Sequence, residues 1–275
     1  MANRTKRQEA IIRRRVFIIS TVAVLVLAIA AVSLLVTLIT KGTKEKDDDK
    51  NKASGSSIAS SEVISSSSKK ESSSSKKEVV VGGVTLDADF TQLLLVNGDN
   101  PLPRDYDANV RKDLVEIDPQ YRNNNYVKEI HKDVYPYITA MVAAAQADGV
   151  DLRVWSPFRS YAIQNDLFQK QVNRVGGDEE KAATVVARPG TSEHNTGLCA
   201  DFNMASDAFE NTKMYKWMTE HAEDYGFVMR YRKDKQPITG VIHESWHWRF
   251  VGINAAKEMN DLDMCLEEYV EYLKK

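Results

Sequence analysis

The chain has 275 residues and a formal net charge of −2, so it lacks the global charge excess that would indicate a nucleic-acid-binding protein. Its two cysteines, Cys199 and Cys265, are too few for the disulfide framework of a small secreted domain. We expect them either to pair with each other or to stay buried as small apolar residues.

Residues 1–40 combine a basic start with a long apolar segment. Residues 1–15 are strongly basic with one glutamate, and the segment from Val16 to Thr40 contains no charged side chain. About 20 apolar residues in a helix span a bilayer core, whereas a cleaved signal peptide has an apolar part of about 7–15. The length also disfavours a buried core helix, and no small-residue cleavage site follows Thr40. We therefore expect an uncleaved single-pass transmembrane anchor at 16–40, a cytoplasmic tail at 1–15, and an extracellular location for the rest of the chain.

The segment 41–81 is dominated by serine and lysine and contains no aromatic residue. Such a composition cannot bury enough apolar surface to offset the entropy lost on folding. We expect a disordered linker, whose typical end-to-end span at this length is about 35 Å. It would hold an outer domain away from the membrane.

The remaining residues, 82–275, are enough for one sizeable core. Amphipathic spacing over 126–150 predicts a helix in which Pro136 is either a kink or a boundary. A strand is expected at 152–156. A helix over 160–177 follows, beginning at the cap residue Ser160 and ending at Gly176, and then a short helix over 178–187.

The second half of this domain continues the mixture of helices and strands. Small and apolar residues predict a strand at 197–203, and a helix follows over 211–227 with Asn211 or Thr212 as its cap. Strands at 227–231 and 245–252 precede a last helix from about Asn254 to the C-terminus. Because no strict βαβ repeat is present, we expect an α+β domain with a mostly antiparallel sheet packed by helices. Residues 87–125 carry no recognisable chemistry and are expected to wrap the core or border a substrate groove.

The sequence HESWH at 243–247 matches the H-E-x-x-H pattern, in which two helical histidines bind zinc and the glutamate is a general base. The match requires a helix, but β-branched and aromatic residues fill the surrounding segment and favour a strand. On a strand, residues four apart are separated by about 13 Å, so His243 and His247 could not share one zinc ion. Glu244 and His247 would serve one site only if a bulge or turn near Ser245 put them on one face.

A second group of candidate ligands lies in ARPGTSEHNTGLCADF, at 187–202. A catalytic zinc ion typically has three protein ligands and a water molecule, and histidine and carboxylate are suitable donors. His194, Asp201 and His247 complete such a set and leave Glu244 free to act as a base.

Three ordered motifs between residues 155 and 252 resemble one known family. SEHNTGLCAD at 192–201 fits Ser-x-His-x-x-Gly-x-x-x-Asp, and ESWHWRFVG at 244–252 fits Glu-x-Trp-His-x-Arg-Tyr/Phe-Val-Gly. SPFRSYAIQ at 156–164 is similar to Ser-Gly-Tyr-Arg-Ser-x-x-x-Gln, with Pro157 and Phe158 in place of Gly-Tyr. Together they resemble the VanY-type zinc D-alanyl-D-alanine carboxypeptidases of bacterial cell walls, including their L,D-carboxypeptidase relatives.

The resemblance implies a role for each matching residue. His194, Asp201 and His247 would bind Zn²⁺, and Glu244 would be the general base. Cys199 stands where the family commonly has alanine, a small-for-small change beside a ligand.

The resemblance also implies how the substrate is bound. Arg159 would stabilise the carbonyl oxygen or bind the terminal carboxylate of the substrate, and Ser192 and Gln164 would line the site. The expected partner is the stem peptide of peptidoglycan. The released D-Ala would come from a pentapeptide ending in D-Ala-D-Ala or, in an L,D-carboxypeptidase, from a tetrapeptide.

Two other functions compete with a membrane-tethered carboxypeptidase. A thermolysin-like endopeptidase would use His243, His247 and a downstream acid such as Glu267, and it requires a helix at HESWH. A non-catalytic module would use a zinc-stabilised fold to bind wall peptides without cleaving them. The presence of Glu244 disfavours this last reading.

Overall fold

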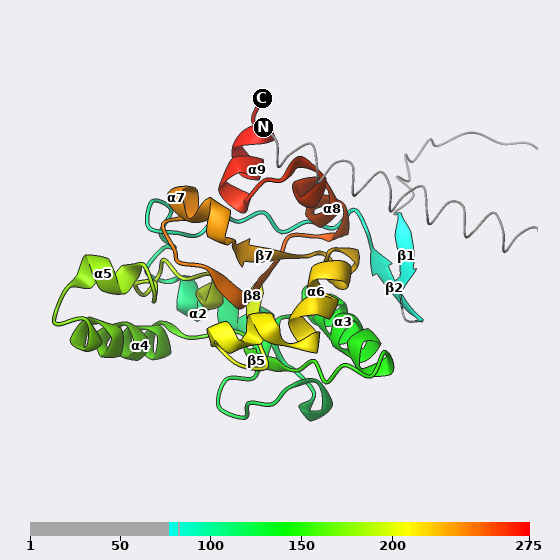
Figure 1. The fold of residues 1–275 in the computed structure, drawn as a ribbon, viewed down its shortest axis with the longest axis horizontal. Coiled ribbons are helices and arrows are strands. Elements are labelled where there is room, and N and C mark those ends of the chain that lie inside the picture. The colour runs from blue at the N-terminus through cyan, green and yellow to red at the C-terminus, as the bar shows by residue number, and fades with distance from the viewer. Residues whose placement is uncertain (1–76, 82) are drawn as a thin grey trace, which may run out of the picture. The chain divides into compact units, whose positions relative to one another are not determined.

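The computed structural model describes residues 77–81 and 83–275 (Figure 1). The predicted cytoplasmic tail at 1–15, the predicted anchor at 16–40 and most of the predicted linker at 41–81 lie outside the described residues. Within the described part of the chain, no helix has both the length and the apolar character needed to span a membrane.

The described chain forms an α+β domain, as predicted. Its strands are β1 (Glu78–Val81), β2 (Val84–Asp87), β3 (Leu114–Glu116), β4 (Glu129–His131), β5 (Val154–Ser156), β6 (Cys199–Phe202), β7 (Phe227–Tyr231) and β8 (Glu244–Phe250). Its helices are α2 (Tyr106–Val110), α3 (Tyr135–Ala147), α4 (Tyr161–Arg174), α5 (Glu179–Ala183), α6 (Lys213–His221), α7 (Gln236–Thr239), α8 (Ile253–Leu262) and α9 (Leu266–Tyr272).

A four-stranded antiparallel sheet lies at the centre of the domain, in the order β5-β6-β8-β7. The hairpins β1–β2 and β3–β4 are separate two-stranded sheets. In Figure 1, α4 and α5 lie together at one end of the domain, and the β1–β2 hairpin lies at the other. The predicted antiparallel sheet packed by helices is therefore confirmed.

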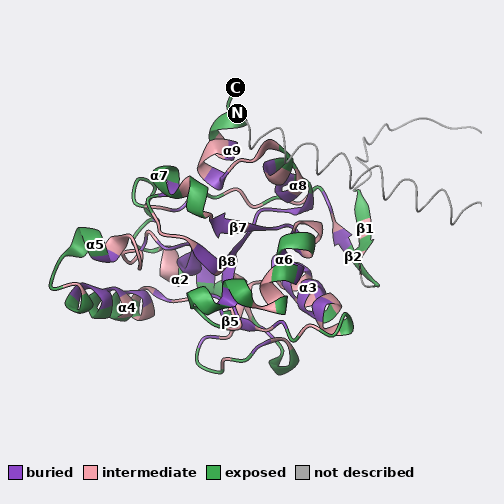
Figure 2. Ribbon diagram, in the orientation of Figure 1, coloured by how far each residue is buried: buried purple, intermediate pink, exposed green. Residues whose placement is uncertain are grey.

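Apolar residues pack on both faces of this sheet. Phe227 belongs to the main core, which includes the buried side of α3, whereas its neighbour Val228 packs with α8 and α9. Successive strand residues point to opposite faces, so β7 separates two apolar clusters. Figure 2 shows that the sheet strands are buried, whereas α4 and α5 present exposed surface.

Several predicted element ends are confirmed by local chemistry. Ser160 caps α4 by accepting a hydrogen bond from the amide of Ile163, and Thr212 caps α6 by accepting one from Tyr215. Pro136 marks a boundary rather than a kink, because it occupies the first turn of α3, where its missing N–H costs nothing.

Three predicted boundaries are wrong. The helix expected over 126–150 begins only at Tyr135, because residues 129–131 pair with β3. The last helix is two helices, α8 and α9, separated where Asp263 adopts a φ of 58°. The end of the predicted linker is β1, because this segment pairs with β2 and packs Val79 and Val81 on the core.

Gly252, which joins β8 to α8, is expected to be intolerant of any side chain. Its φ is +100°, and an added Cβ would lie 2.2 Å from the carbonyl oxygen of Phe90. Backbone strain of this kind costs about 1–3 kcal/mol, and the clash adds to it. Gly252→Ala should therefore lower the free energy of unfolding, measured by urea denaturation, by more than Gly149→Ala. Gly149 also has a positive φ, +74°, but open space at its Cβ, so equal losses would contradict the steric argument.

Candidate metal centre

Three elements bring the predicted ligands together. His194 lies in a short 3-10 helix, η3 (Glu193–Thr196), directly before β6. Asp201 lies in β6 and is the Cα partner of His247 in the neighbouring strand β8. All three side chains are buried, with exposed fractions of 1–4%.

The donor atoms of these residues form a compact triangle. His194 Nε2 lies 3.1 Å from His247 Nδ1, and Asp201 Oδ1 lies 3.4 Å and 3.2 Å from these two nitrogens. Bonds of about 2.0–2.1 Å in tetrahedral geometry place donors about 3.3 Å apart. Asp201 Oδ1 is buried and finds no hydrogen-bond partner among the described residues. Two imidazoles and a carboxylate at these separations fit a catalytic zinc ion.

Hydrogen bonds on the far side of each imidazole set its orientation. The Nδ1–H of His194 donates to the carbonyl oxygen of Pro157 at 2.7 Å, which leaves Nε2 with its lone pair toward the centre. The Nε2–H of His247 donates to Glu193 Oε2 at 3.4 Å, which leaves Nδ1 free in the same way. Such outer partners are typical of metal-binding histidines.

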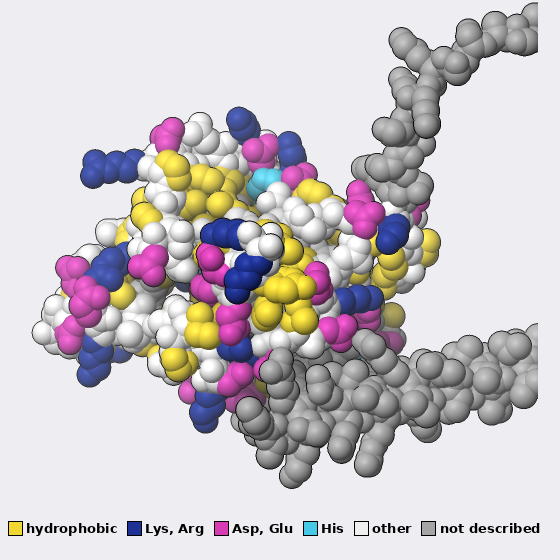
Figure 3. Space-filling model, turned by 90° about the horizontal axis from the view of Figure 1, so that it is seen from above, with side chains coloured by type: hydrophobic (Ala, Val, Ile, Leu, Met, Phe, Trp, Pro, Cys, Tyr) yellow, Lys and Arg dark blue, Asp and Glu magenta, His cyan; other side chains and the backbone are white. Residues whose placement is uncertain are grey.

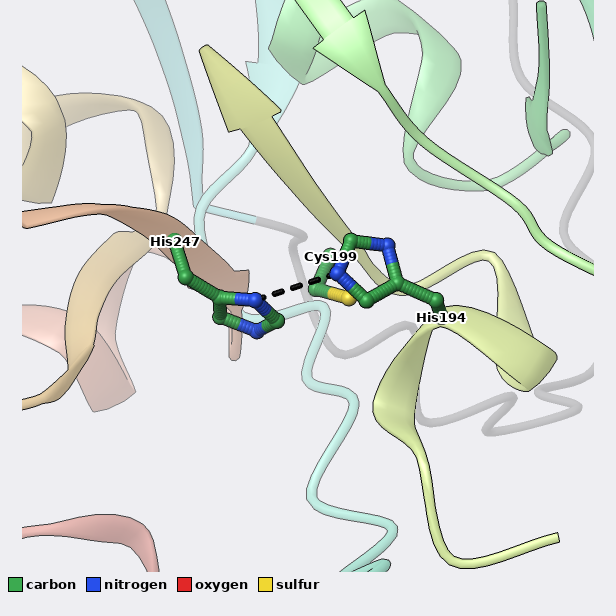
Figure 4. A group of neighbouring side chains, drawn as sticks. All are labelled: His194, Cys199 and His247. Carbon is green, nitrogen blue, oxygen red and sulfur yellow. Dashed lines mark hydrogen bonds between the residues drawn. The ribbon is translucent and has the colours of Figure 1, made fainter. Parts of the chain in front are cut away.

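The thiol of Cys199 belongs to the same cluster. Its sulfur and the nitrogens of His194 and His247 lie within 4.8 Å of one another and could hold a metal ion together (Figure 4). Cys199 and Asp201 are two residues apart in β6, so both point to the same face of the sheet. Cys199 and Cys265 are both free and buried, so of the two sequence expectations the buried one is confirmed.

An irregularity in β8 brings Glu244 to the cluster. Tyr231 and Met229, two residues apart in β7, pair with Glu244 and Trp248, four residues apart in β8. The predicted bulge is therefore present, and Glu244 Oε2 lies 3.7 Å from His247 Nδ1. Burial raises the pKa of the Glu244 carboxyl to about 7, although the charge of His247 opposes this shift.

The predicted substrate-binding residues either hydrogen-bond to the segment 187–194, which ends at His194, or lie within it. The amide of Arg159 donates to the carbonyl of His194, and its buried Nε has no hydrogen-bond partner among the described residues. Gln164 donates through Nε2 to the carbonyl of Ala187, while its buried Oε1 is likewise unpartnered. Ser192 is buried at the start of η3, where its side chain makes no capping hydrogen bond.

The helical H-E-x-x-H arrangement is absent, because residues 244–250 form β8. His243 instead contacts the carbonyl oxygen of Tyr231 and lies 3.7 Å from Glu210. Glu267, the acid that such a site would need, is bound to Arg230. The strand at 244–250 agrees with the prediction that His243 and His247 do not share a metal ion.

Two residues of the site were not found from the sequence. Glu193 is the buried partner of His247, and Tyr231 packs its ring against that histidine at a centroid distance of 4.9 Å. Tyr231 also lines a cavity of about 350 Å³ together with residues of α5 and α7, among others. Glu193 sits at an unspecified position of its motif, so no residue pattern distinguished it.

The profile of the D-alanyl-D-alanine carboxypeptidase family VanY matches residues 127–253. The chain is 38% identical over 191 residues to YodJ of Bacillus subtilis (strain 168), covering 66% of this chain and 68% of YodJ. It is 37% identical to a crystallised glutamate-to-alanine variant of the vancomycin resistance D,D-pentapeptidase VanY in complex with Zn(II), with a TM-score of 0.54 and coverage of 65% and 98%. It is 36% identical to the LD-carboxypeptidase LdcB, with a TM-score of 0.59 and coverage of 71% and 94%.

A buried cluster of two imidazoles, a carboxylate and a thiol with an adjacent carboxyl fits a metal-dependent hydrolase. The chain belongs to the VanY family of D-alanyl-D-alanine carboxypeptidases. It is accordingly a zinc-dependent carboxypeptidase that acts on peptidoglycan-related substrates.

Metal binding should depend on Asp201 rather than on Cys199. Asp201→Ala removes one corner of the triangle. Loss of a hydrogen-bond partner of a metal ligand typically weakens metal binding about 10- to 100-fold, and loss of Asp201 should weaken zinc binding by more than that. Cys199→Ala leaves the triangle intact and should retain one zinc ion per chain, as should His243→Ala. Elemental analysis after dialysis against a weak chelator measures the difference. Loss of zinc from Cys199→Ala, with zinc kept by Asp201→Ala, would show that the thiol is the third ligand.

Proposed function

We propose that this chain is a membrane-anchored zinc carboxypeptidase that removes the C-terminal D-Ala from peptidoglycan stem peptides on the outer side of the membrane. The observation that carries the proposed chemistry is the triangle of donor atoms, with Glu244 Oε2 at 3.7 Å from one of them, His247 Nδ1. The proposed location is supported by the basic residues 1–15 and the uncharged segment 16–40.

His194, Asp201 and His247 would hold the zinc ion, and Glu244 would be the general base. When bound, zinc polarises the scissile carbonyl and makes a water molecule more acidic. Glu244 then takes a proton from the attacking water and passes it to the leaving amine. Its carboxyl suits both steps because it is buried beside the ligands and held there by the irregularity in β8.

Arg159 and Gln164 supply unsatisfied polar groups that a peptide end could use. The buried Nε of Arg159 is a charged donor, and a carboxylate or a developing oxyanion is its natural acceptor. Gln164 Oε1 could accept a hydrogen bond from a substrate N–H. Because only the free terminus marks the bond that an exopeptidase cleaves, we assign Arg159 to the terminal carboxylate and Ser192 to the lining of the same site.

The cavity beside Tyr231 would receive the upstream part of the stem peptide. Its lining includes Asp99, Glu180 and Arg188 as charged groups, and Thr191 precedes Ser192. Figure 3 shows one face of the molecule, on which basic and acidic side chains are interspersed. Because the cavity lining itself carries both signs of charge, recognition there would depend on local groups rather than on an extended field of one sign.

An L,D-carboxypeptidase acting on tetrapeptide stems is the second candidate function. It is favoured by the similarity to LdcB, whose TM-score of 0.59 exceeds the 0.54 of the D,D-pentapeptidase VanY. Incubation of the protein with pentapeptide and tetrapeptide muropeptides, read by mass spectrometry, separates the two. Loss of one alanine from the pentapeptide supports the first function, and loss from the tetrapeptide alone supports the second. If the zinc-loaded protein forms no product from either muropeptide, both activities are refuted and a non-catalytic binding module remains.

Glu244→Ala should abolish turnover while zinc remains bound. A general base contributes about 10²- to 10⁴-fold, and the three proposed ligands are untouched by the change. Product formation and zinc content are measured on the same sample. His243→Ala, one residue away, serves as the control and should keep full activity. Retained activity in Glu244→Ala would refute the assignment of the base.

Arg159→Ala should reduce kcat/KM by roughly 10- to 150-fold, since a hydrogen bond to a charged group contributes about 1.5–3 kcal/mol. Arg159→Lys should recover part of the loss, because an ammonium keeps the charge but lacks the planar fork. Arg153→Ala, which removes an arginine paired with exposed Asp151, is the matched control and should be neutral. An Arg159→Ala enzyme as active as the control would exclude contact with the substrate terminus.

A further inference from the structure

A buried carboxylate lies directly behind the metal centre. Glu193 has a side chain that is 0% exposed, and its Oε2 accepts the hydrogen bond from His247 Nε2. Its other oxygen, Oε1, accepts from Arg230 Nε at 2.7 Å and from Arg249 Nη1 at 2.9 Å. The two oxygens of Glu193 therefore have different hydrogen-bond partners: Oε2 contacts His247, and Oε1 contacts the two arginines.

The two arginines hold Glu193 in one orientation. An unpaired buried charge is strongly destabilising, and both guanidiniums are themselves buried. Arg230 makes two further hydrogen bonds, at 2.8 and 2.6 Å, to Glu267 of α9. Arg249 donates to the backbone carbonyls of Gln92 and Leu94. The cluster is balanced in charge, and it ties α9 and the 92–94 segment to Glu193.

We propose that Glu193 is a positioning residue for His247, which it holds with Nδ1 directed at the metal. Because Oε2 can only accept, the proton of the His247 imidazole stays on Nε2 and the lone pair on Nδ1 stays available. A carboxylate acceptor also makes the imidazole a stronger donor to the metal. His194 has only a neutral carbonyl, that of Pro157, in the equivalent place. This inference rests on the proposed zinc-dependent function.

The test compares variants of Glu193 with a control in the same cluster. Glu193→Ala removes the acceptor, whereas Glu193→Gln keeps an acceptor but removes its charge. Zinc affinity is measured by competition with a chromophoric chelator, and the absorption spectrum of the Co²⁺-substituted protein reports ligand geometry. We expect about 100-fold weaker zinc binding for Glu193→Ala and about 10-fold for Glu193→Gln, with altered Co²⁺ spectra.

Glu267→Gln is the matched control, since it removes one negative charge from the cluster and contacts Arg230 rather than His247. It should lower stability but leave zinc affinity and the Co²⁺ spectrum unchanged. Glu193→Asp covers the case in which the other variants fail to fold. It keeps the charge between the arginines, but its side chain is one methylene shorter, so zinc binding should still weaken.

The outcomes separate this inference from the proposed function. Wild-type zinc affinity in a folded Glu193→Ala or Glu193→Asp protein would overturn the positioning role. An equal loss of affinity in Glu267→Gln would also overturn it, since the effect would then be one of general stability. Weakened binding specific to Glu193, in a protein whose wild type cleaves no muropeptide, would support the positioning role while refuting the proposed activity.

Discussion

The antiparallel pairing of β6 with β8 is the constraint on which the site depends. It sets Asp201 opposite His247, so two candidate ligands are fixed by backbone hydrogen bonds. His194 needs only the short η3 turn, which leads directly into β6, to reach the same point. A core on both faces of the sheet makes a slip in this register costly, because a one-residue shift would move every side chain of a strand to the opposite face and disrupt the packing on both. The same β6–β8 register therefore both stabilises the sheet and sets the geometry of the centre.

Charge balance is the second requirement of the centre. Glu193 is surrounded by Arg230 and Arg249, and although burial opposes it, these arginines hold the pKa of the Glu193 carboxyl well below its usual range. That carboxyl thus stays an anion in a place that would otherwise favour the neutral acid. The segment around 92–94 and helix α9, which look remote from any chemistry, are bonded to these arginines. Part of the segment 87–125 therefore wraps the core, which is one of the two placements expected from the sequence.

Local sequence signals predicted much of the fold. Ser160 and Thr212 each offer a hydroxyl at a helix start, and Pro136 is favoured in a first helical turn, so these boundaries depend on neighbouring residues alone. The break at Asp263 and the pairing of residues 129–131 depend on tertiary packing, which periodicity does not report. The site shows the same division. His194, Asp201, Glu244 and His247 stand in motifs with fixed spacing, and the structure brings them together. Glu193 and Tyr231 act through contacts with residues far along the chain, which no single-sequence pattern encodes.

The irregularity between Glu244 and Trp248 gives the spacing of the motif a physical meaning. Between the pairs Tyr231–Glu244 and Met229–Trp248, β8 advances by four residues while β7 advances by two. At this irregularity the Glu244 carboxyl reaches to 3.7 Å from His247 Nδ1, although the two residues are three apart. In an unbroken strand that separation would put them on opposite sides. The spacing of three residues between Glu244 and His247 therefore brings their side chains together only when this irregularity is present. An insertion or deletion in this interval would therefore move the Glu244 carboxyl away from the His247 imidazole.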